Sequence, residues 1–370
     1  MPSLFLVVNV DWFLLTHRLP IALEAKKKGY DVTIVAIDSG YSDQITKHGF
    51  KFIPIPMSRS GLNIFVELKT ILFFIQLYKK HKPDIIHQVA MKPVIYGSIA
   101  SKFVKVGKVV NALPGLGFAL SDSSNFLLRK TMKQLFKFAF SNGNMRFIFQ
   151  NHDDYNEVVG LNIVDKKNVF IIKGSGVDLH EFAFTREPVQ EKVMFFLPAR
   201  ILADKGIIEF IEASKIVEEK FPNQSSFIIA GRIDLENKAG ISESYFKELL
   251  QNSPVIWVGE QSNIYEWLCN SNVVVLPSYR EGIPKSLIEA CAVGRAIITT
   301  NVPGCKEVVT NNYNGLIVEK KQIKELAAAM EFLLIHEKIR NEMGEHGRKI
   351  AEAEFSIQSV LDKTFEIYNN

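Results

Sequence analysis

Short apolar runs alternate along the chain with longer stretches in which apolar residues recur at helical spacing. This order is typical of β-α units, whose parallel strands are buried on both faces of a sheet. The pattern therefore predicts an α/β fold. In the first half we expect strands at Leu4–Val10, Val32–Ile37, Lys51–Ile55, Asp84–His87, Lys108–Ala112, Met145–Phe149 and Val169–Ile172.

The same alternation restarts in the second half and predicts a second doubly wound sheet. Between the halves, two glycines surround a serine at Gly174–Gly176, a composition that favours a hinge over the interior of an element. We place the domain boundary near Val177. The strands expected beyond it are Val193–Leu197, Ser226–Ala230, Val255–Val258, Val273–Leu276, Ala296–Thr299 and Gly315–Val318.

The intervals between strands have the length and period of helices. One helix is expected over Thr16–Lys28, with Gly29 as the glycine that commonly follows a helix end. The tail from about His336 to Tyr368 predicts two helices, and Ser356 is a suitable N-cap for the second.

Two Rossmann-like domains facing across a cleft are thus expected, at 1–177 and 178–355, with a final helix over about 356–370 that packs on the first. The length of 370 residues agrees, because it exceeds one ordinary core and suits two.

Charge and cysteine content narrow the function. The excess of 44 basic over 40 acidic residues is too small to indicate a nucleic-acid partner. The three cysteines lack the close spacings of a zinc site, which favours a reducing compartment and no structural metal. The N-terminus has no basic segment of the kind that begins a signal peptide, and charges interrupt the most apolar helix, Ile64–Tyr78. We therefore expect a cytoplasmic protein without a transmembrane segment.

The segment Ser278–Ala290, SYREGIPKSLIEA, follows an expected strand and combines a glycine loop with the start of a helix. We place Pro284 as the first helical residue, N1. Free backbone amides and the helix dipole would then face an anion, so that a diphosphate could bind without metal. The amides concerned are those of Lys285, Ser286 and Leu287.

Two carboxylates bracket this anion site, Glu281 in the loop and Glu289 on the second turn of the helix. Carboxylates bind sugar and ribose hydroxyls through charge-assisted hydrogen bonds, so the pair suits a nucleotide sugar. Taken alone, Glu281 could equally be a solvated loop residue and Glu289 a charge on a helix face.

Arg200 and Lys205 share the loop that follows the first strand of the second domain. Ligands of open α/β sheets bind beyond the carboxyl ends of the strands, where two cations would neutralise a leaving diphosphate much as a magnesium ion would. The alternative is a surface Arg and Lys with Asp204 as their partner.

The segment Glu281–Glu289 has seven residues between its glutamates and resembles the E-x7-E motif of retaining family-4 glycosyltransferases of the GT-B fold. Arg200 and Lys205 match the Arg and Lys that bind the donor diphosphate in those enzymes. The resemblance covers nearly the whole chain. Further segments are similar to bacterial members that build O-antigen, capsule and protein-linked glycans: Asn9–Phe13, Thr16–Pro20, Lys92–Pro93, Tyr96–Gly97, Gly115–Phe118 and Gly174–Asp178.

The resemblance implies roles for these residues. Glu281 would lie near the donor sugar hydroxyls and Glu289 on the ribose, and the residues around sugar and phosphate would be Gly282, Ile283, Pro284, Lys285, Ser286 and Leu287. The catalytic candidates are therefore Glu281, Arg200, Lys205 and His17. The glycine-rich first loop of many relatives is absent, since this chain has Asn9-Val10-Asp11-Trp12 there.

On the acceptor side of the cleft we expect Asp11, Trp12, His17, Arg18, Lys92, Gly115 and Gly117. For His17, a capping or core role is the alternative. No residue of the first domain is an obvious nucleophile, and retaining enzymes of this kind are thought to react by front-face attack. We expect no covalent intermediate.

Several motifs are missing from the sequence. It contains no D-x-D triplet, no G-x-x-x-x-G-K-[ST], and no G-x-G-x-x-G after the first strand. These absences argue against a metal-dependent sugar transferase, an ATPase and a dehydrogenase. Asp153 and Asp154, beside His152, could suggest a metal site, but we interpret them as capping the helix that follows.

A basic, aromatic-rich segment at Leu127–Phe140 carries Arg129, Lys130, Lys133 and Lys137 among apolar residues. It could lie on an anionic leaflet, or it could be an ordinary amphipathic helix with a solvated basic face. Membrane contact would suit a lipid-diphosphate-linked acceptor, and would place the protein at the cytoplasmic face of the inner membrane.

The sequence thus predicts a metal-independent glycosyltransferase without cofactors. It would move a hexose or N-acetylhexosamine from a UDP-sugar to a lipid-linked saccharide. Two alternatives remain, a nucleotide-sugar 2-epimerase of the same architecture and an inactive nucleotide-sugar-binding scaffold protein.

Overall fold

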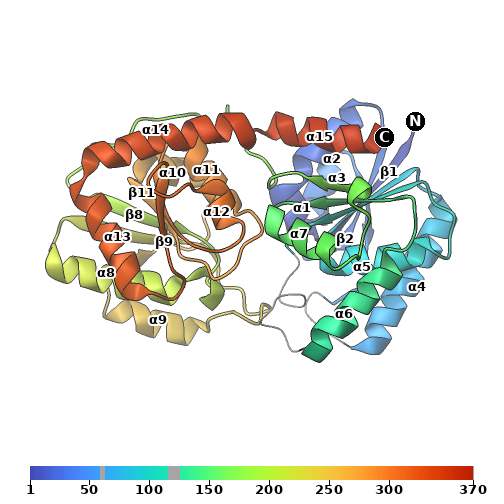
Figure 1. Cartoon of the computed structure of the whole chain (residues 1–370), viewed down its shortest axis with the longest axis horizontal. Coiled ribbons are helices and arrows are strands. Elements are labelled where there is room, and N and C mark those ends of the chain that lie inside the picture. Colours follow the sequence, from blue (N-terminus) through green and yellow to red (C-terminus); the bar gives the residue numbers. More distant parts are fainter. Residues whose placement is uncertain (59–62, 116–125, 370) are drawn as a thin grey trace. The chain divides into compact units, whose positions relative to one another are not determined.

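The computed structural model describes residues 1–58, 63–115 and 126–369 (Figure 1). The chain divides into two compact units. The first comprises Met1–Lys173 with Val360–Asn370, and the second comprises Gly174–Ser359. Each unit contains one parallel sheet, as the alternation of strands and helices predicts.

The sheet of the first unit has seven parallel strands in the order β3-β2-β1-β4-β5-β6-β7. All seven expected strands are found, with ends that differ by at most two residues from the expectation. Their bounds are β1 Ser3–Val10, β2 Asp31–Ile37, β3 Lys51–Pro54, β4 Ile85–Val89, β5 Lys108–Leu113, β6 Met145–Phe149 and β7 Val169–Ile171.

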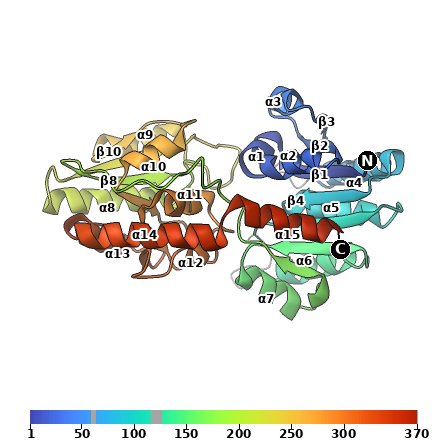
Figure 2. The ribbon, with the colours of Figure 1, turned by 90° about the horizontal axis from the view of Figure 1, so that it is seen from above.

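Helices cover both faces of this sheet (Figure 2). The helices are α1 Asp11–His17, α2 Leu19–Lys27, α3 Ser42–Lys47, α4 Ile64–His81, α5 Met91–Ser101, α6 Phe126–Ala139 and α7 His152–Gly160. Buried side chains of α4, α5, α6 and α7 form one hydrophobic cluster with alternate strand residues such as Val7 and Ile86. These four helices therefore share a face of the sheet, because successive strand residues point to opposite faces.

The expected helix Thr16–Lys28 is wrong in its bounds. The structure has two helices, α1 and α2, separated at Arg18, whose φ of −131° is not helical. Pro20 explains the break, since it has no amide hydrogen to donate to Thr16 and its ring would clash with that carbonyl. The end is as expected, because Gly29 follows α2 with a positive φ of 86°.

The second unit has six parallel strands in the order β10-β9-β8-β11-β12-β13, and all six expected strands are present. Its strands are β8 Val193–Pro198, β9 Ser225–Ala230, β10 Val255–Trp257, β11 Val273–Leu276, β12 Ala296–Thr300 and β13 Gly315–Val318. Its helices are α8 Ile207–Lys220, α9 Glu243–Gln251, α10 Ile264–Asn270, α11 Lys285–Val293, α12 Cys305–Val308, α13 Ile323–Ile335 and α14 Glu337–Glu354.

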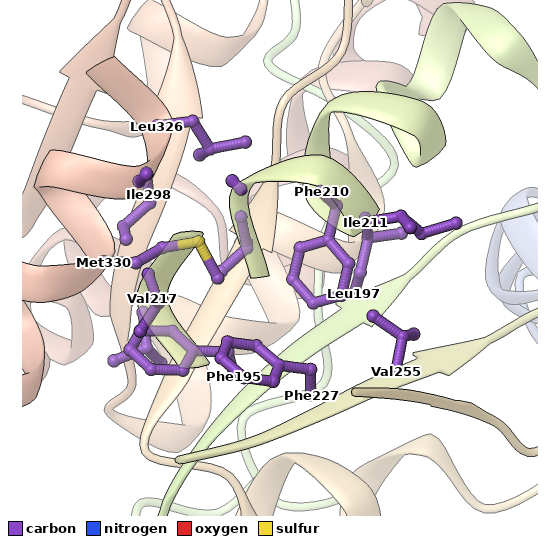
Figure 3. Packing of buried hydrophobic residues seen from close by; sticks show 14 of the residues in the cluster. Phe195, Leu197, Phe210, Ile211, Val217, Phe227, Val255, Ile298, Leu326 and Met330 are labelled. Carbon is purple, nitrogen blue, oxygen red and sulfur yellow. The ribbon is translucent and has the colours of Figure 1, made fainter. Parts of the chain in front are cut away.

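Buried hydrophobic side chains, aromatic and aliphatic, pack on one face of this second sheet (Figure 3). The rings of Phe195 on β8 and Phe227 on β9 stack with centroids 5.5 Å apart, and Phe210 of α8 meets Phe227 edge-on. Met330 of α13 closes the cluster and is fully buried. This packing fixes the strands whose carboxyl ends carry the predicted donor residues.

The last helix, α15 Ile357–Asn369, follows α14 after a break of two residues, Phe355 and Ser356. Ser356 caps it as expected, because its hydroxyl accepts a hydrogen bond from the Ser359 amide at 3.3 Å. From Val360 on, α15 belongs to the first unit, where the Tyr368 hydroxyl lies 2.6 Å from Nδ1 of the buried His87. Across the described parts of the chain, no helix has the length and apolar character needed to cross a bilayer.

Candidate functional site

The carboxyl ends of the parallel strands in the second unit lie at one edge of its sheet, and the residues predicted to bind the donor follow two of them. The loop after β8 carries Arg200 and Lys205, and the loop after β11 carries Glu281. Backbone contacts join the loops, since the Tyr279 amide donates to the Asp204 carbonyl at 2.8 Å. The structure therefore brings the two predicted segments together.

Lys205 and Glu281 form an ion pair across these loops. Their side chains are only 19% and 10% exposed, so the pair is shielded from water more than a surface salt bridge is. The same carboxylate oxygen, Glu281 Oε1, accepts a hydrogen bond from the Ser278 hydroxyl at 2.7 Å. Glu281 is thus a held side chain and not the solvated loop residue of the alternative interpretation.

Arg200 pairs with Asp234, which lies in the loop after β9, with 2.5 Å between Nη1 and Oδ2. Asp204, the partner in the alternative interpretation, has Oδ1 buried without a hydrogen-bond partner in the described structure. Burial raises the pKa of the Asp204 carboxyl, Lys205 and Arg200 lower it, and Glu281 raises it further. Three loops therefore gather alternating cations and carboxylates at one sheet edge.

Helix α11 begins at this edge, one residue later than expected. Pro284 is its N-cap with an extended ψ of 120°, so Lys285 and not Pro284 is the first helical residue. The Leu287 amide donates to the Pro284 carbonyl at 3.1 Å, so it is already used. The amides of Lys285 and Ser286 come before Leu287 and Ile288, the first residues that bond to the Pro284 carbonyl, so they have no acceptor within the helix, as an anion site requires.

Within the predicted donor segment, Ile283 and Leu287 place their side chains in the hydrophobic core, being 8% and 0% exposed. Only their backbone could serve a ligand. Gly282 lies against Gly304, where a Cβ would stand 1.6 Å from the Gly282 carbonyl oxygen, and Gly304 has a φ of 80°. This close approach fixes the loop that carries Glu281.

Glu289 is on the second turn of α11, where it is 7% exposed, and its Oε1 lies 3.1 Å from the Lys285 ammonium. Burial raises the pKa of this carboxyl, and the charge of Lys285 lowers it in part. The alternative of a plain helix-face charge does not fit a side chain so deeply buried. Two ion pairs, Lys205–Glu281 and Lys285–Glu289, thus accompany the start of α11.

Sequence reasoning missed two residues at this edge, Asp234 and Tyr279. Asp234 could not be found, because its only signal is its position shortly after a strand. Tyr279 was quoted within the segment without a role, yet its hydroxyl bonds to the Glu209 carboxylate and the Lys321 ammonium lies 4.8 Å above its ring. These partners come from helix α8 and the loop after β13, which are far apart in the sequence.

In the first unit, Trp12 and His17 are partly exposed at the two ends of α1. His17 was expected at the start of the first helix, but it is the last residue of α1. Its ring stacks on Phe13 with centroids 4.5 Å apart, and its Nδ1 lies 2.6 Å from the Thr16 hydroxyl. These contacts orient the imidazole and leave it half-buried.

Asp11 and Arg18 occupy interior positions that do not suit direct contact with an acceptor. The Asp11 carboxylate is fully buried and accepts hydrogen bonds from the backbone amides of Ser39 and Tyr41, at 2.7 and 2.9 Å. It thereby fixes the loop after β2. Arg18 is 4% exposed, and burial lowers its pKa to about 10 while Tyr368 partly offsets this shift.

Lys92, at the start of α5, forms an ion pair of 2.6 Å with Glu67 of α4 and donates to the Ser58 carbonyl. Gly115 follows β5 and is partly exposed, whereas Gly117 lies outside the described residues. The expected cap of α7 is corrected, because Asn151 and not Asp153 or Asp154 is its N-cap. Over residues 1–58, 63–115 and 126–369 there is no group of three or more His, Cys, Asp or Glu side chains that could hold a metal ion.

Comparison with known proteins agrees with this arrangement. Residues 3–151 match the family described as glycosyl transferase 4-like, and residues 180–350 match the glycosyl transferases group 1. In Campylobacter jejuni, N,N'-diacetylbacillosaminyl-diphospho-undecaprenol alpha-1,3-N-acetylgalactosaminyltransferase is 30% identical, with 95% of this chain and 94% of the relative covered.

Two further proteins are similar over most of their length. The UDP-Gal:alpha-D-GlcNAc-diphosphoundecaprenol alpha-1,3-galactosyltransferase of Escherichia coli is 25% identical, covering 92% of this chain and 89% of the relative. The structure of Anabaena HepE in complex with UDP superposes with a TM-score of 0.76 at 16% identity, covering 99% of each chain, and has the same fold. From its two family matches and its full-length relative, the chain belongs to the family-4, group 1 glycosyltransferases of the GT-B fold.

Proposed function

We propose that this glycosyltransferase moves a hexose or an N-acetylhexosamine from a UDP-sugar to a lipid-diphosphate-linked saccharide, as a step in surface polysaccharide or glycan assembly. The observation that carries the proposal is the joining of the two loops after β8 and β11 by Lys205 and Glu281, beside the first turn of α11. Relatives named for UDP-galactose and for diphospho-undecaprenol acceptors support the substrate classes. They give no support to a 2-epimerase or an inactive scaffold.

In this proposal the second unit binds the donor. Lys205 has three ammonium donors and Arg200 has five guanidinium donors, so each could keep its present carboxylate partner and still bind a phosphate oxygen. The amides of Lys285 and Ser286 would bind the same diphosphate at the helix N-terminus. Glu281 would accept hydrogen bonds from the sugar hydroxyls, and Glu289 from the ribose.

The transfer we propose retains the configuration at the anomeric carbon. The acceptor hydroxyl oxygen forms a bond to that carbon while the bond to the β-phosphate oxygen of UDP breaks, and the departing phosphate oxygen takes the hydroxyl proton. Arg200 and Lys205 stabilise the negative charge that develops on the diphosphate. No covalent sugar-enzyme intermediate forms, so a glycosyl-enzyme adduct detected by mass spectrometry would contradict this step.

We further propose that no divalent metal ion is needed, because two side-chain cations and the N-terminus of α11 would together neutralise the diphosphate. The first unit would bind the acceptor. After Asp11 and Arg18 are found buried, the candidates that remain are Trp12, His17, Lys92, Gly115 and Gly117, the last of which lies outside the described residues. Because the acceptor would be anchored by a lipid, we propose that the protein associates peripherally with an anionic membrane surface, on the cytoplasmic face of the inner membrane.

A thermal-shift panel tests the donor assignment. UDP, GDP, ADP, several UDP-sugars and NAD are added with and without EDTA to the wild type and to Arg200→Ala. A ligand at one hundred times its Kd stabilises the native state by about 2.7 kcal/mol, so a specific ligand gives a clear rise in Tm. We expect UDP compounds to raise Tm in EDTA and Arg200→Ala to lose most of the effect. Stabilisation by NAD alone, or by no nucleotide, would contradict the assignment.

A further inference from the structure

Helix α4 is apolar on two sides. One side, with Phe74, Leu77 and Tyr78, is buried in the core of the first unit. The other side exposes four large apolar side chains within nine residues: Ile64 at 66%, Phe65 at 80%, Leu68 at 53% and Leu72 at 58%. No other helix or strand in the described part of the chain exposes more than two.

The spacing of these residues puts them on one face of the helix, since Phe65, Leu68 and Leu72 stand at i, i+3 and i+7. The start of the helix is held by Asn63, whose side chain accepts a hydrogen bond from the Phe65 amide at 3.0 Å. A contiguous exposed apolar face of this kind marks an interaction site more often than scattered surface residues do.

The charge of the helices around this exposed face indicates what kind of partner it would bind. The helices α4, α5 and α6 lie along one side of the first unit (Figure 1), where α5 contacts both others. Together they contain eight Lys and Arg residues and one acidic residue, Glu67, which Lys92 neutralises. The whole chain has a net charge of +4, so this layer carries more positive charge than the entire protein.

The structure limits how helix α6 could contact a membrane, because aromatic side chains of this segment are buried. Two of its segment's aromatic side chains, Phe136 and Phe140, are buried in the core at 0% and 5% exposure. Of the apolar side chains described there, only Phe138 is exposed, at 51%, and the Lys102 ammonium lies 4.0 Å above its ring. Among the described side chains of α6, the lysines are available to an anionic surface, whereas most of the apolar ones are not.

We propose that α4 is the element that enters the bilayer interface, with Ile64, Phe65, Leu68 and Leu72 as apolar anchors, and that the lysines of α6 bind anionic lipid headgroups beside it. Amphipathic helices bind membranes by this combination of buried apolar area and electrostatic attraction. The inference deepens the membrane part of the proposed function, and it commits to a lipid surface because the layer is both basic and apolar.

The position of α4 suits an acceptor anchored in that membrane. The first turns of α4 and α5 meet through Glu67 and Lys92, and α5 begins just after the carboxyl end of β4. Ligands of parallel sheets bind at that edge. The anchoring face therefore begins near the edge where the first unit would receive a saccharide carried by a membrane lipid.

Liposome flotation tests the proposal with the full chain. We compare the wild type with the triple variant Phe65→Ser, Leu68→Ser, Leu72→Ser, on vesicles of phosphatidylcholine with or without phosphatidylglycerol. A matched control changes three exposed apolar residues elsewhere, in Leu23→Ser, Ile256→Ser, Ile335→Ser, and a charge variant carries Lys130→Gln, Lys133→Gln, Lys137→Gln. Surface substitutions of this kind seldom destabilise a fold, and Tm verifies it.

We expect the α4 variant to partition at least about tenfold less onto phosphatidylglycerol vesicles, with the control within about twofold of the wild type. The charge variant should lose binding by about fivefold per lysine near the surface, and high salt should weaken wild-type binding likewise. Equal flotation of the α4 variant and the wild type would overturn the proposal. So would wild-type self-association in ultracentrifugation that the α4 variant abolishes, because the face would then bind a second copy.

The UDP thermal shift of the same variants separates this inference from the proposed function. The α4 variant should keep the full UDP shift, since α4 belongs to the first unit and the donor loops belong to the second. If the wild type floats through α4 but no UDP shift is found, the donor assignment fails and the membrane surface stands.

Discussion

Replacing Lys205 by methionine removes one cation from the donor edge while keeping a side chain of similar length. In the structure this ammonium pairs with Glu281, and the two side chains are 19% and 10% exposed. The substitution therefore leaves Glu281 with the Ser278 hydroxyl as its remaining partner, at 2.7 Å. Both stability and ligand binding should respond, but by different amounts.

The stability loss follows from the burial of the pair. Exposed pairs contribute up to about 1 kcal/mol, and breaking a fully buried one costs about 3–5 kcal/mol. A pair shielded to this degree lies between these limits, so we expect Lys205→Met to lower the free energy of unfolding by about 1–3 kcal/mol. Glu281→Gln should cost less, because the Lys205 side chain can reach water more readily than a carboxylate held in the loop.

Lys205→Met should also weaken the binding of UDP. A hydrogen bond to a charged group contributes about 1.5–3 kcal/mol, which corresponds to an increase of about 10- to 150-fold in the Kd of UDP for Lys205→Met. Glu281→Gln removes a competitor for the ammonium, so its Kd for UDP should stay within about threefold of the wild type. Its sugar transfer should nevertheless fall, since Glu281 is assigned to the donor sugar.

Isothermal titration with UDP in EDTA, together with turnover, measures the contrast. The reasoning is refuted if Lys205→Met binds UDP as tightly as the wild type, or if both variants weaken UDP equally. The second result would mean that the pair only shapes the loop.

Three further predictions concern stability. Burial raises the pKa of Glu289 in the folded state, so ionising this carboxyl at neutral pH destabilises the fold, whereas below the unfolded pKa near 4.5 the carboxyl is protonated and the penalty disappears. Chemical denaturation should therefore find Glu289→Gln more stable than the wild type at neutral pH. The difference in the free energy of unfolding should close on acidification. Burial lowers the pKa of His87 to about 3 from 6.5, so the stability of the first unit should fall as pH drops through that interval, by at most about 1.4 kcal/mol per pH unit, and His87→Gln should flatten this dependence. Gly304→Ala should destabilise by about 2 kcal/mol or more and weaken UDP binding, because the new Cβ meets the Gly282 carbonyl at a positive φ; Gly143→Ala, whose Cβ meets nothing within 4 Å, is the control and should be near neutral.

The fold was largely predictable because parallel strands buried on both faces leave a strong signal. Each run of apolar β-branched residues became a strand, even the short β7 and β10. Helix bounds were less secure. The break at Arg18 depends on Pro20, and the start of α11 on the ψ angle of Pro284, neither of which periodicity reveals.

The donor edge was more predictable than the acceptor residues. Arg200, Lys205 and Glu281 lie in the loops that follow strands β8 and β11, so the order of parallel strands brings them to one edge. Asp11 also follows a strand, yet its carboxylate turns inward to bind the amides of Ser39 and Tyr41. Which way a polar side chain turns depends on partners distant in the sequence, and no local pattern shows them.

The exposed face of α4 could not be predicted either. Its apolar residues lie on two sides of the helix, a pattern that is equally typical of a helix packed between two other elements. Only the tertiary structure shows that Phe74 and Leu77 point into the core while Phe65 and Leu72 do not.

The most direct test of the central claim is a transfer reaction in EDTA with a panel of UDP-sugars and a polyprenyl-diphosphate-linked monosaccharide, followed by mass spectrometry of the lipid product. The account predicts a product heavier by one hexose or N-acetylhexosamine, release of UDP, and a loss of about 100-fold or more in rate with Glu281→Gln. Transfer that requires an added metal ion would contradict the metal-independent chemistry. Equal rates for the wild type and Glu281→Gln would contradict the assignment of the donor site.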